Sequence, residues 1–346
     1  MQVKLSEIYK YSHIRPNLNL SERELVVEFY WNGETWPLYL PDKNGILVQM
    51  QSVGGPISGN YFAEFPNRED DIHFQFLDTL WQKGIYKGMS SNVRALDNAV
   101  VKLGVLIAQM VHNHHGKQGI PFSSDLITAN VEHFLVTIRS IFDFLYECII
   151  KLLAAHPSRK KKSSLPKKLS RFILSGNTIE SADDVANKYD LPYDFVKLYV
   201  QQAHFFVQIR QLRDKIIHGA RQNIQTIFDM PMGYGFGKTE KPFSEFYEIK
   251  NNQVDGNIAS LVPFLSHIMK TVIGSCDNLI SSLFKEYEFL PKISPLNSLY
   301  SRHPFNYYSK ALMDTSNNQP VWFSDIIPPV ALNEKLKLDY PPWQKP

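Results

Sequence analysis

The chain has 346 residues, of which 44% are apolar and 21% are charged, and its formal net charge is +3 at pH 7. So much apolar material can form a sizeable core, which excludes an intrinsically disordered protein. A net charge of +3 is too small to attract nucleic acid over the whole surface, so any affinity for RNA has to come from local basic patches.

Residues 1–88 form a region that we expect to contain β-strands. Residues 25–31 and 34–40 are rich in branched and aromatic side chains, and they flank the Asn32-Gly33 pair, which favours the tight turn of a β-hairpin. Residues 46–50 are predicted as a further strand. Aromatic side chains in this region could stack on bases, but packing against the rest of the protein is the simpler use for them.

Four later segments carry apolar residues at intervals of three and four positions, the spacing that gives a helix one buried stripe. The stripes run over residues 93–110, 127–152, 206–216 and 258–283. Four amphipathic helices with such seams predict antiparallel bundle packing. We therefore predict a mainly α fold whose centre is a four-helix bundle within residues 89–290.

On the second of these helices, charged residues recur every four positions outside the apolar stripe: Arg139, Asp143, Glu147 and Lys151. The simpler interpretation is a ladder of solvent-exposed ion pairs, each contributing about 0.3 kcal/mol. The alternative is that Arg139 and Asp143 face the end of a neighbouring helix and support a functional site there.

A basic segment lies between the second and third helices, where two serines and a proline interrupt helix formation. Its seven positive charges within thirteen residues are Arg159, Lys160, Lys161, Lys162, Lys167, Lys168 and Arg171. A solvated loop accounts for such a cluster. If the segment lies near Arg213, it would instead attract an RNA backbone through counterion release, with an affinity that depends on salt and not on base sequence.

The third helical segment ends in the sequence RDKIIHG, residues 213–219. The imidazole of His218 can exchange protons near neutral pH, and the guanidinium of Arg213 can hold a phosphate through two parallel hydrogen bonds. A simpler interpretation places Arg210, Asp214 and His218 four residues apart on one polar face, with an ion pair between Arg210 and Asp214. In that case Gly219 ends the helix and no chemistry is implied.

Arg213, the polar Asp214 and, five positions after the arginine, His218 close a late helix of a helical bundle. In these features the chain resembles the HEPN superfamily (higher eukaryotes and prokaryotes nucleotide-binding) over about residues 89–290. The resemblance implies a metal-independent endoribonuclease that needs no cofactor. Such an enzyme cuts RNA by attack of the ribose 2′-hydroxyl and leaves a 2′,3′-cyclic phosphate. His218 would act as general acid or base, Arg213 would stabilise charge on the phosphoryl oxygens, and Asp214 would have an orienting role.

The resemblance also has implications for partners, because family members include toxins and phage-defence effectors that commonly dimerise. Five residues correspond to about 140° of rotation on a regular helix, so Arg213 and His218 point in different directions, and a two-fold axis could combine them across a homodimer. The expected partners are RNA, a second copy of the chain, and an antitoxin or regulatory protein. A subgroup carries, two residues after the histidine, a tyrosine that an antitoxin modifies. Ala220 stands there in this chain, which argues against that regulation.

The sequence thus supports two functions. The first is an endoribonuclease, a toxin or defence effector, with Arg213, Asp214 and His218 as catalytic residues. Its supporting residues would be Arg210, Arg139 and Asp143. The second is a non-catalytic HEPN-like helical protein that binds RNA, a nucleotide or a protein partner.

Two further segments have a glycine or proline content that indicates their structure. Residues 233–239 imitate part of a phosphate-binding loop, which requires a glycine five positions before Gly237, where Met232 stands. We therefore reject a nucleotide site and predict a flexible loop able to cover the proposed site. Residues 291–346 hold 9 of the 21 prolines, which predicts a largely irregular extension anchored by its aromatic residues.

The cysteines and histidines carry little further chemistry. Cys148 and Cys276 lie on apolar stripes and are predicted to be reduced core residues of a cytoplasmic protein. His112, His114 and His115 are interpreted as exposed residues at a helix end and not as metal ligands. The N-terminus lacks a secretory apolar core, and no uninterrupted apolar run approaches a membrane span, so no membrane association is expected.

Overall fold

The computed structural model describes residues 2–4, 38–41, 46–50, 59–63, 72–83, 88–116, 123–156, 165–176, 178–217, 227–241, 243–287, 289, 298–302, 305–315 and 321–327. It is mainly helical with small antiparallel sheets, which confirms the predicted fold class at that level. The chain forms two compact units. One contains residues 1–74, 294–310 and 328–346, and the other, the helical unit, contains residues 75–293 and 311–327. The boundaries expected after residues 88 and 290 stay predictions.

The first unit contains two small sheets. Strands β1 (Gln2–Lys4), β3 (Ile46–Met50) and β2 (Leu38–Pro41) form an antiparallel sheet in that order. Strands β4 (Gly59–Ala63) and β11 (Ser298–Arg302) pair with each other, also antiparallel. The strand predicted at residues 46–50 is confirmed. The turn predicted at Asn32-Gly33 lies outside the described residues.

The four predicted long helices are present in the helical unit. They are α3 (Met89–His115), α4 (Ser123–Ala155), α7 (Tyr193–Ile217) and α9 (Leu261–Glu286). The last helix begins three residues later than its apolar stripe suggested, because Ile258 belongs to a strand. Ser260 fixes this start, since its side chain accepts a 3.3 Å hydrogen bond from the backbone N–H of Val262.

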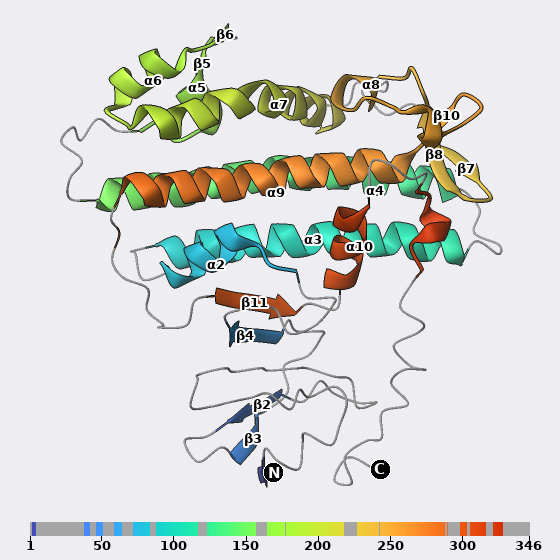
Figure 1. Ribbon diagram of the computed structural model, residues 1–346, viewed down its shortest axis with the longest axis horizontal. Coiled ribbons are helices and arrows are strands. Elements are labelled where there is room, and N and C mark those ends of the chain that lie inside the picture. The colour runs from blue at the N-terminus through green and yellow to red at the C-terminus, as the bar shows by residue number, and fades with distance from the viewer. Residues whose placement is uncertain are drawn as a thin grey trace. The chain divides into compact units, whose positions relative to one another are not determined.

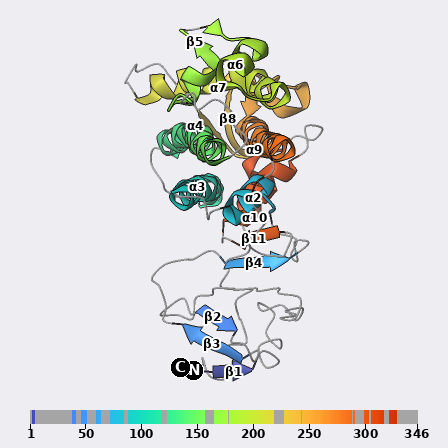
Figure 2. The ribbon, with the colours of Figure 1, turned by 90° about the vertical axis from the view of Figure 1, so that its left-hand side faces the viewer.

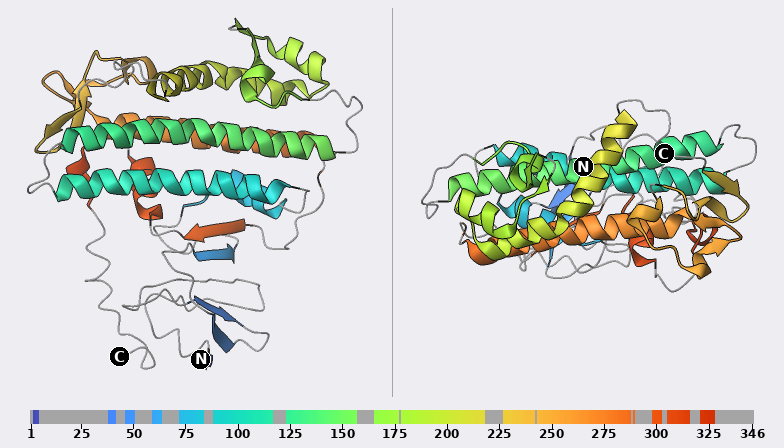
Figure 3. Two further views of the ribbon diagram at one scale, coloured as in Figure 1. Left: turned by 180° about the vertical axis from the view of Figure 1, so that it is seen from behind. Right: turned by 90° about the horizontal axis from the view of Figure 1, so that it is seen from above.

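The helices of this unit lie in three layers, which are clearest in the end-on view of Figure 2. Helix α2 (Gln75–Gln82) and α3 form one layer, α4 and α9 the next, and α7 covers both α4 and α9. Seen from above, α7 crosses the middle layer at an angle (Figure 3). Each long helix runs antiparallel to the long helix that precedes it in the sequence (Figure 1). Lys151, late in α4, donates a 2.5 Å hydrogen bond to the carbonyl of Gly88, just before α3.

The predicted apolar stripes form the contacts between these layers. Their residues are buried wherever burial is described, except the half-buried Ile258, and full burial of one such side chain contributes about 1.5–3 kcal/mol. Fully buried members include Leu103, Ile107, Phe134, Ile138, Ile209, Leu265 and Val272. Helical periodicity alone therefore identified the core of this unit. Whether the long helices form a bundle of HEPN type belongs to the proposal below.

Helix α3 also has the length and composition of a membrane span. Among the residues that the structure describes, it is the one helix that meets this criterion, with a mean hydropathy of 1.2 over its most apolar 18 residues. In this structure 56% of that stretch is buried inside the protein. Core helices of soluble proteins meet the same criterion, so the observation is weak support for a membrane role.

A small insertion separates α4 from α7. It consists of α5 (Leu169–Ile173), the β5–β6 pair (Leu174–Ser175 with Thr178–Ile179) and α6 (Ala182–Tyr189). Phe172 of α5 stacks on Tyr189 of α6 and packs edge-on against Tyr199 of α7, with ring centroids 5.3 Å apart in both pairs. The insertion is thereby fixed to the N-terminal half of α7.

A four-stranded antiparallel sheet packs at the other end of the helices. Its strands, in spatial order, are β7 (Phe228–Met230), β8 (Gly233–Gly237), β10 (Ile258–Ser260) and β9 (Val254–Asp255). Short helices α8 (Phe243–Phe246) and η2 (Asn251–Gln253) connect β8 to β9. The prediction of a flexible loop at residues 233–239 is wrong, because residues 233–236 are buried strand residues.

The reason for this error lies in the alternation of glycine with aromatic residues. Tyr234 and Phe236 are fully buried, and Phe236 stacks on Phe243 with ring centroids 4.1 Å apart. Gly235 lies against the neighbouring strand, where a side chain would not fit. Glycine and aromatic residues in strict alternation have the period of a strand, and glycine permits the close approach of another backbone.

This packing predicts a large effect of Gly235→Ala. The added Cβ would clash with Cγ2 of Ile258 and lie 2.8 Å from the carbonyl oxygen of Ala259, so we expect a loss of about 1–3 kcal/mol in the free energy of unfolding. Gly274→Ala is the matched control, because no atom lies within 4 Å of its Cβ position inside α9. It should stabilise by up to about 1 kcal/mol. Urea denaturation measures both, and equal midpoints for the two variants would contradict the packing at Gly235.

The C-terminal extension is more regular than predicted. Besides β11 it contains α10 (Asn306–Asp314) and η3 (Phe323–Asp325), so the prediction of an irregular chain is wrong for these stretches. Anchoring by an aromatic residue is confirmed for Trp322, which is buried. Phe323 is fully buried, and its ring packs 5.3 Å from that of Tyr234. Residues 321–327 thus complete the end of the helical unit.

Candidate functional site

The described part of the predicted catalytic motif lies in the last two turns of α7. Nη1 of Arg213 donates a 2.7 Å hydrogen bond to Oδ1 of Asp214, and Nε of Arg210 lies 3.6 Å from Oδ2 of the same carboxylate. The side chains are 40% exposed for Arg210, 38% for Arg213 and 37% for Asp214. One carboxylate therefore serves two accessible guanidinium groups. His218 lies outside the described residues.

Arg139 of α4 has a different environment, because its side chain is only 10% exposed. Its Nη1 lies 2.5 Å from Oδ1 of Asp143, and its guanidinium carbon lies 4.3 Å from the ring centroid of Phe206 on α7. A cation over an aromatic face is held by the ring quadrupole. The interpretation of Arg139 as a member of a solvent-exposed ladder is therefore wrong, and Phe206 is a partner that sequence reasoning missed.

The ladder divides because residues four positions apart advance by about 40° around a helix. Over the three steps from Arg139 to Lys151 the direction changes by about 120°. Arg139 consequently faces α7, whereas Glu147 and Lys151 reach the start of α3, where both contact Asn92. Charge spacing alone could not show which neighbour each residue meets.

Electrostatics link Arg139 to the residues on α7. Burial lowers the pKa of Arg139, the adjacent Asp143 raises it, and the positive charges of Arg213 and Arg210 lower it further. The structure thus brings together three arginines and two aspartates from two helices, with one excess positive charge. We call this set of five residues the arginine cluster. It includes all three predicted supporting residues, Arg210, Arg139 and Asp143.

The described part of the basic segment is not beside the arginine cluster. Residues 159–162 lie outside the described residues, whereas Lys167, Lys168 and Arg171 are described and exposed. Arg171 belongs to α5, which packs on α7 at Tyr199. Fourteen residues separate Tyr199 from Arg213, about 21 Å at 1.5 Å per helical residue. Direct action at Arg213 would require the basic segment to lie near it, and the described part of the segment does not.

The histidines at the end of α3 have packing roles in part. His114 is buried, contrary to the prediction, and its ring lies edge-on to Tyr234 at 5.9 Å. Nε2 of His115 is 3.0 Å from the carbonyl oxygen of Ile326. Within the described ranges, no group of three or more histidine, cysteine, aspartate or glutamate residues could hold a metal ion.

The two cysteines are buried and unpaired with each other, as predicted for reduced core residues. Burial raises the pKa of the Cys148 thiol to about 12, and it also raises the pKa of Cys276. Because the thiolate is the reactive form, neither residue is suited to act as a nucleophile at neutral pH.

Comparison with known proteins adds no relative. No family model, no curated protein and no solved structure matches the chain. The expected relationship to HEPN proteins therefore stays a prediction from the residues of this chain.

Proposed function

We propose that this protein is a metal-independent endoribonuclease of HEPN type that acts at the arginine cluster. The observation that supports the proposal most directly is the meeting of Arg139 with Arg210 and Arg213. Two of these guanidinium groups, those of Arg210 and Arg213, are accessible to solvent, because their side chains are 40% and 38% exposed. Guanidinium groups match the geometry and charge of a phosphodiester. The sequence then supplies His218 five residues after Arg213.

In the proposed reaction the 2′-oxygen of a ribose forms a bond to the adjacent phosphorus while the bond from phosphorus to the 5′-oxygen breaks. His218 removes the proton of the 2′-hydroxyl or donates a proton to the departing 5′-oxygen. Such transfer contributes about 10²–10⁴-fold. Arg213 stabilises the charge on the phosphoryl oxygens. Asp214, hydrogen-bonded to Arg213 at 2.7 Å, orients that guanidinium.

We further propose that the protein works as a homodimer and as a toxin or defence effector in the cytoplasm. The motif supports a dimer, because Arg213 and His218 are separated by about 140° on a regular helix. Two copies could place the arginine of one protomer near the histidine of its partner. An antitoxin or regulatory protein would be the natural further partner of a toxin. Lys167, Lys168 and Arg171 would then hold RNA away from the cleaved bond.

The test is cleavage of end-labelled total RNA and tRNA in EDTA, with the wild type, Arg213→Ala and His218→Ala compared at equal folded concentration. We expect 2′,3′-cyclic phosphate and 5′-hydroxyl ends from the wild type only, with the rate lowered by about 10²–10⁴-fold in His218→Ala. Cleavage that requires Mg²⁺, or products with 5′-phosphates, would contradict the proposal. Equal cleavage by all three proteins would reveal a contaminating nuclease.

The ion pairs of the cluster favour a second candidate, a non-catalytic helical protein that binds RNA, a nucleotide or a protein partner. Asp214 already partners both Arg210 and Arg213, and Arg139 is held by Asp143 and Phe206. These contacts give each arginine a charged or aromatic partner without any substrate. RNA binding that depends on Arg213, with no cleavage by the wild type, would establish this function instead.

A further inference from the structure

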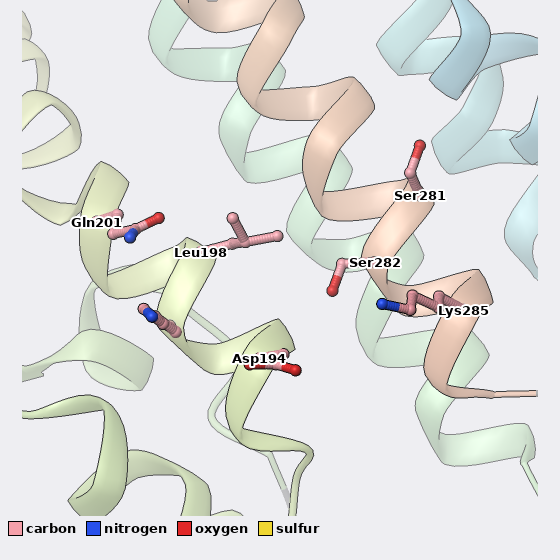
Figure 4. A pocket seen from close by; sticks show the side chains of 7 residues that line it. Asp194, Leu198, Gln201, Ser281, Ser282 and Lys285 are labelled. Carbon is pink, nitrogen blue, oxygen red and sulfur yellow. The ribbon is translucent and has the colours of Figure 1, made fainter.

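A shallow groove lies between the N-terminal half of α7 and the C-terminal half of α9, with a volume of about 430 Å³. Its walls are formed by Asp194, Lys197, Leu198, Gln201, Ser282 and Lys285. Figure 4 shows Leu198 directed from α7 toward α9, and Lys285 and Ser282 directed from α9 toward α7. None of these residues is among the site residues predicted from the sequence.

Local sequence explains the hollow. Helix α9 is apolar over most of its length, but small serines occupy positions 281 and 282 where it faces α7. Ser282 and Lys285 are three residues apart and therefore lie on one face of the helix. A serine in place of a larger residue leaves room beneath the lysine. The volume is within the range of about 300–1,000 Å³ that is usual for small-molecule sites.

The polar groups of the groove are free to bind. Among the described residues, Lys285, Lys197 and Ser282 have no ion-pair or hydrogen-bond partner, although Nζ of Lys197 lies 5.9 Å from the ring centroid of Tyr193. Two ammonium groups, a hydroxyl and the Gln201 amide can all donate hydrogen bonds. Asp194 is the one carboxylate of the lining, so the groove carries an excess positive charge.

We propose that this groove binds a small phosphate-bearing ligand. The phosphate is held by Lys285 and Ser282 from α9, since lysines and hydroxyls are effective phosphate donors, and Lys197 of α7 adds positive charge to the lining. Leu198 supplies an apolar surface for the rest of the ligand, and Asp194 can accept a hydrogen bond from a ligand hydroxyl or amino group.

The groove is separate from the arginine cluster. Gln201, the groove residue closest in sequence to Arg213, precedes it by twelve residues, or about 18 Å along α7. A ligand in the groove therefore does not touch Arg213, and the proposal does not depend on ribonuclease activity. Under the two proposals together, the N-terminal half of α7 binds the small ligand and the C-terminal end of α7 contacts RNA.

The test is calorimetric titration of the full chain with inorganic phosphate, adenosine 5′-monophosphate and adenosine, which differ in the group the groove should recognise. We expect the monophosphate and inorganic phosphate to bind and adenosine to bind at least tenfold more weakly than the monophosphate. Lys285→Gln keeps the shape of the groove and removes one charge, so it should weaken monophosphate binding about tenfold or more. Lys102→Gln, an exposed lysine of α3, is the matched control and should leave it unchanged.

Two further variants make the outcome decisive. Ser282→Leu fills the groove without changing charge and should abolish binding, provided that circular dichroism shows a native helix content and melting transition. Arg213→Ala removes a proposed phosphate contact of the arginine cluster and none of the groove, so it should still show the monophosphate binding that Lys285→Gln weakens. Loss of binding in Arg213→Ala with full binding in Lys285→Gln would place the phosphate at the arginine cluster and overturn the groove. Absence of phosphate binding by the wild type would overturn it as well.

Discussion

Replacing Arg213 by alanine is expected to lower the rate of RNA cleavage by about 10²–10³-fold, the usual cost of removing one donor that stabilises an oxyanion. The fold should be nearly unaffected. The ion pair of Arg213 with Asp214 is more than one third exposed on both sides, and pairs of this kind contribute about 0–1 kcal/mol. Single-turnover cleavage of a defined RNA measures the rate, and thermal unfolding measures the stability.

Two companion variants separate the possible causes of that loss. Removing Arg213 leaves the carboxylate of Asp214 unpaired on that side, and its charge could repel the phosphate. The double variant Arg213→Ala/Asp214→Asn removes both charges, so recovery of the rate in it would assign the loss to repulsion and contradict a catalytic Arg213. Arg94→Ala is the matched control: Arg94 is an exposed arginine of α3 that belongs neither to the arginine cluster nor to the basic segment, and the variant should retain most of the activity.

Asp214 itself has opposing effects that should be separable. Its carboxylate competes with a substrate phosphate for Arg213 and Arg210, but it also holds Arg213 in place. Asp214→Asn should therefore improve KM by up to about fivefold, the equivalent of a surface ion pair of about 1 kcal/mol, while it lowers kcat. A change in KM alone would mean that Asp214 only competes with the substrate.

The apolar residues of the helical unit were predictable because a helix repeats its buried side every three to four positions. The stripes at residues 93–110 and 127–152 fall within α3 and α4, and their members are buried. The same reasoning failed at β8, where only three glycines and two aromatics are available to show a period of two. It also failed for α10, because prolines elsewhere in the extension dominated the interpretation.

The polar residues were less predictable, because periodicity does not show which neighbour a polar face meets. Arg139 has the same spacing from Asp143 as Glu147 has from Lys151, yet Arg139 is buried against Phe206 whereas Lys151 reaches Gly88. Only the crossing of α7 over α4 distinguishes them. For the same reason the groove between α7 and α9 could not be foreseen, since its two walls are about eighty residues apart in the chain.

The second large effect is expected at Arg139, and it concerns stability. Arg139→Ala should lower the free energy of unfolding by about 2–3 kcal/mol. The variant loses the contact with Phe206, which contributes about 2 kcal/mol when desolvated, and the packing of the aliphatic stem. The carboxylate of Asp143 is 43% exposed, so water can solvate it and the penalty of an isolated buried charge is not added. Urea denaturation gives the value, and Arg94→Ala, an exposed arginine of α3, should stay within about 0.5 kcal/mol of the wild type.

A double-mutant cycle tests whether Arg139 stabilises the fold through its contact with Phe206. Phe206→Leu removes the aromatic face and keeps most of the apolar volume, and Arg139→Met removes the charge and keeps an aliphatic stem, so the coupling of these two variants measures the cation–π contact. A coupling near zero would contradict that contact. The positive charges of Arg213 and Arg210 repel the Arg139 guanidinium and so lower its pKa. If Arg139 serves only the fold, Arg139→Met should leave RNA affinity unchanged once the protein is folded. If it contributes positive charge to the cluster, the same variant should weaken binding most at low salt, where exposed charges are least screened.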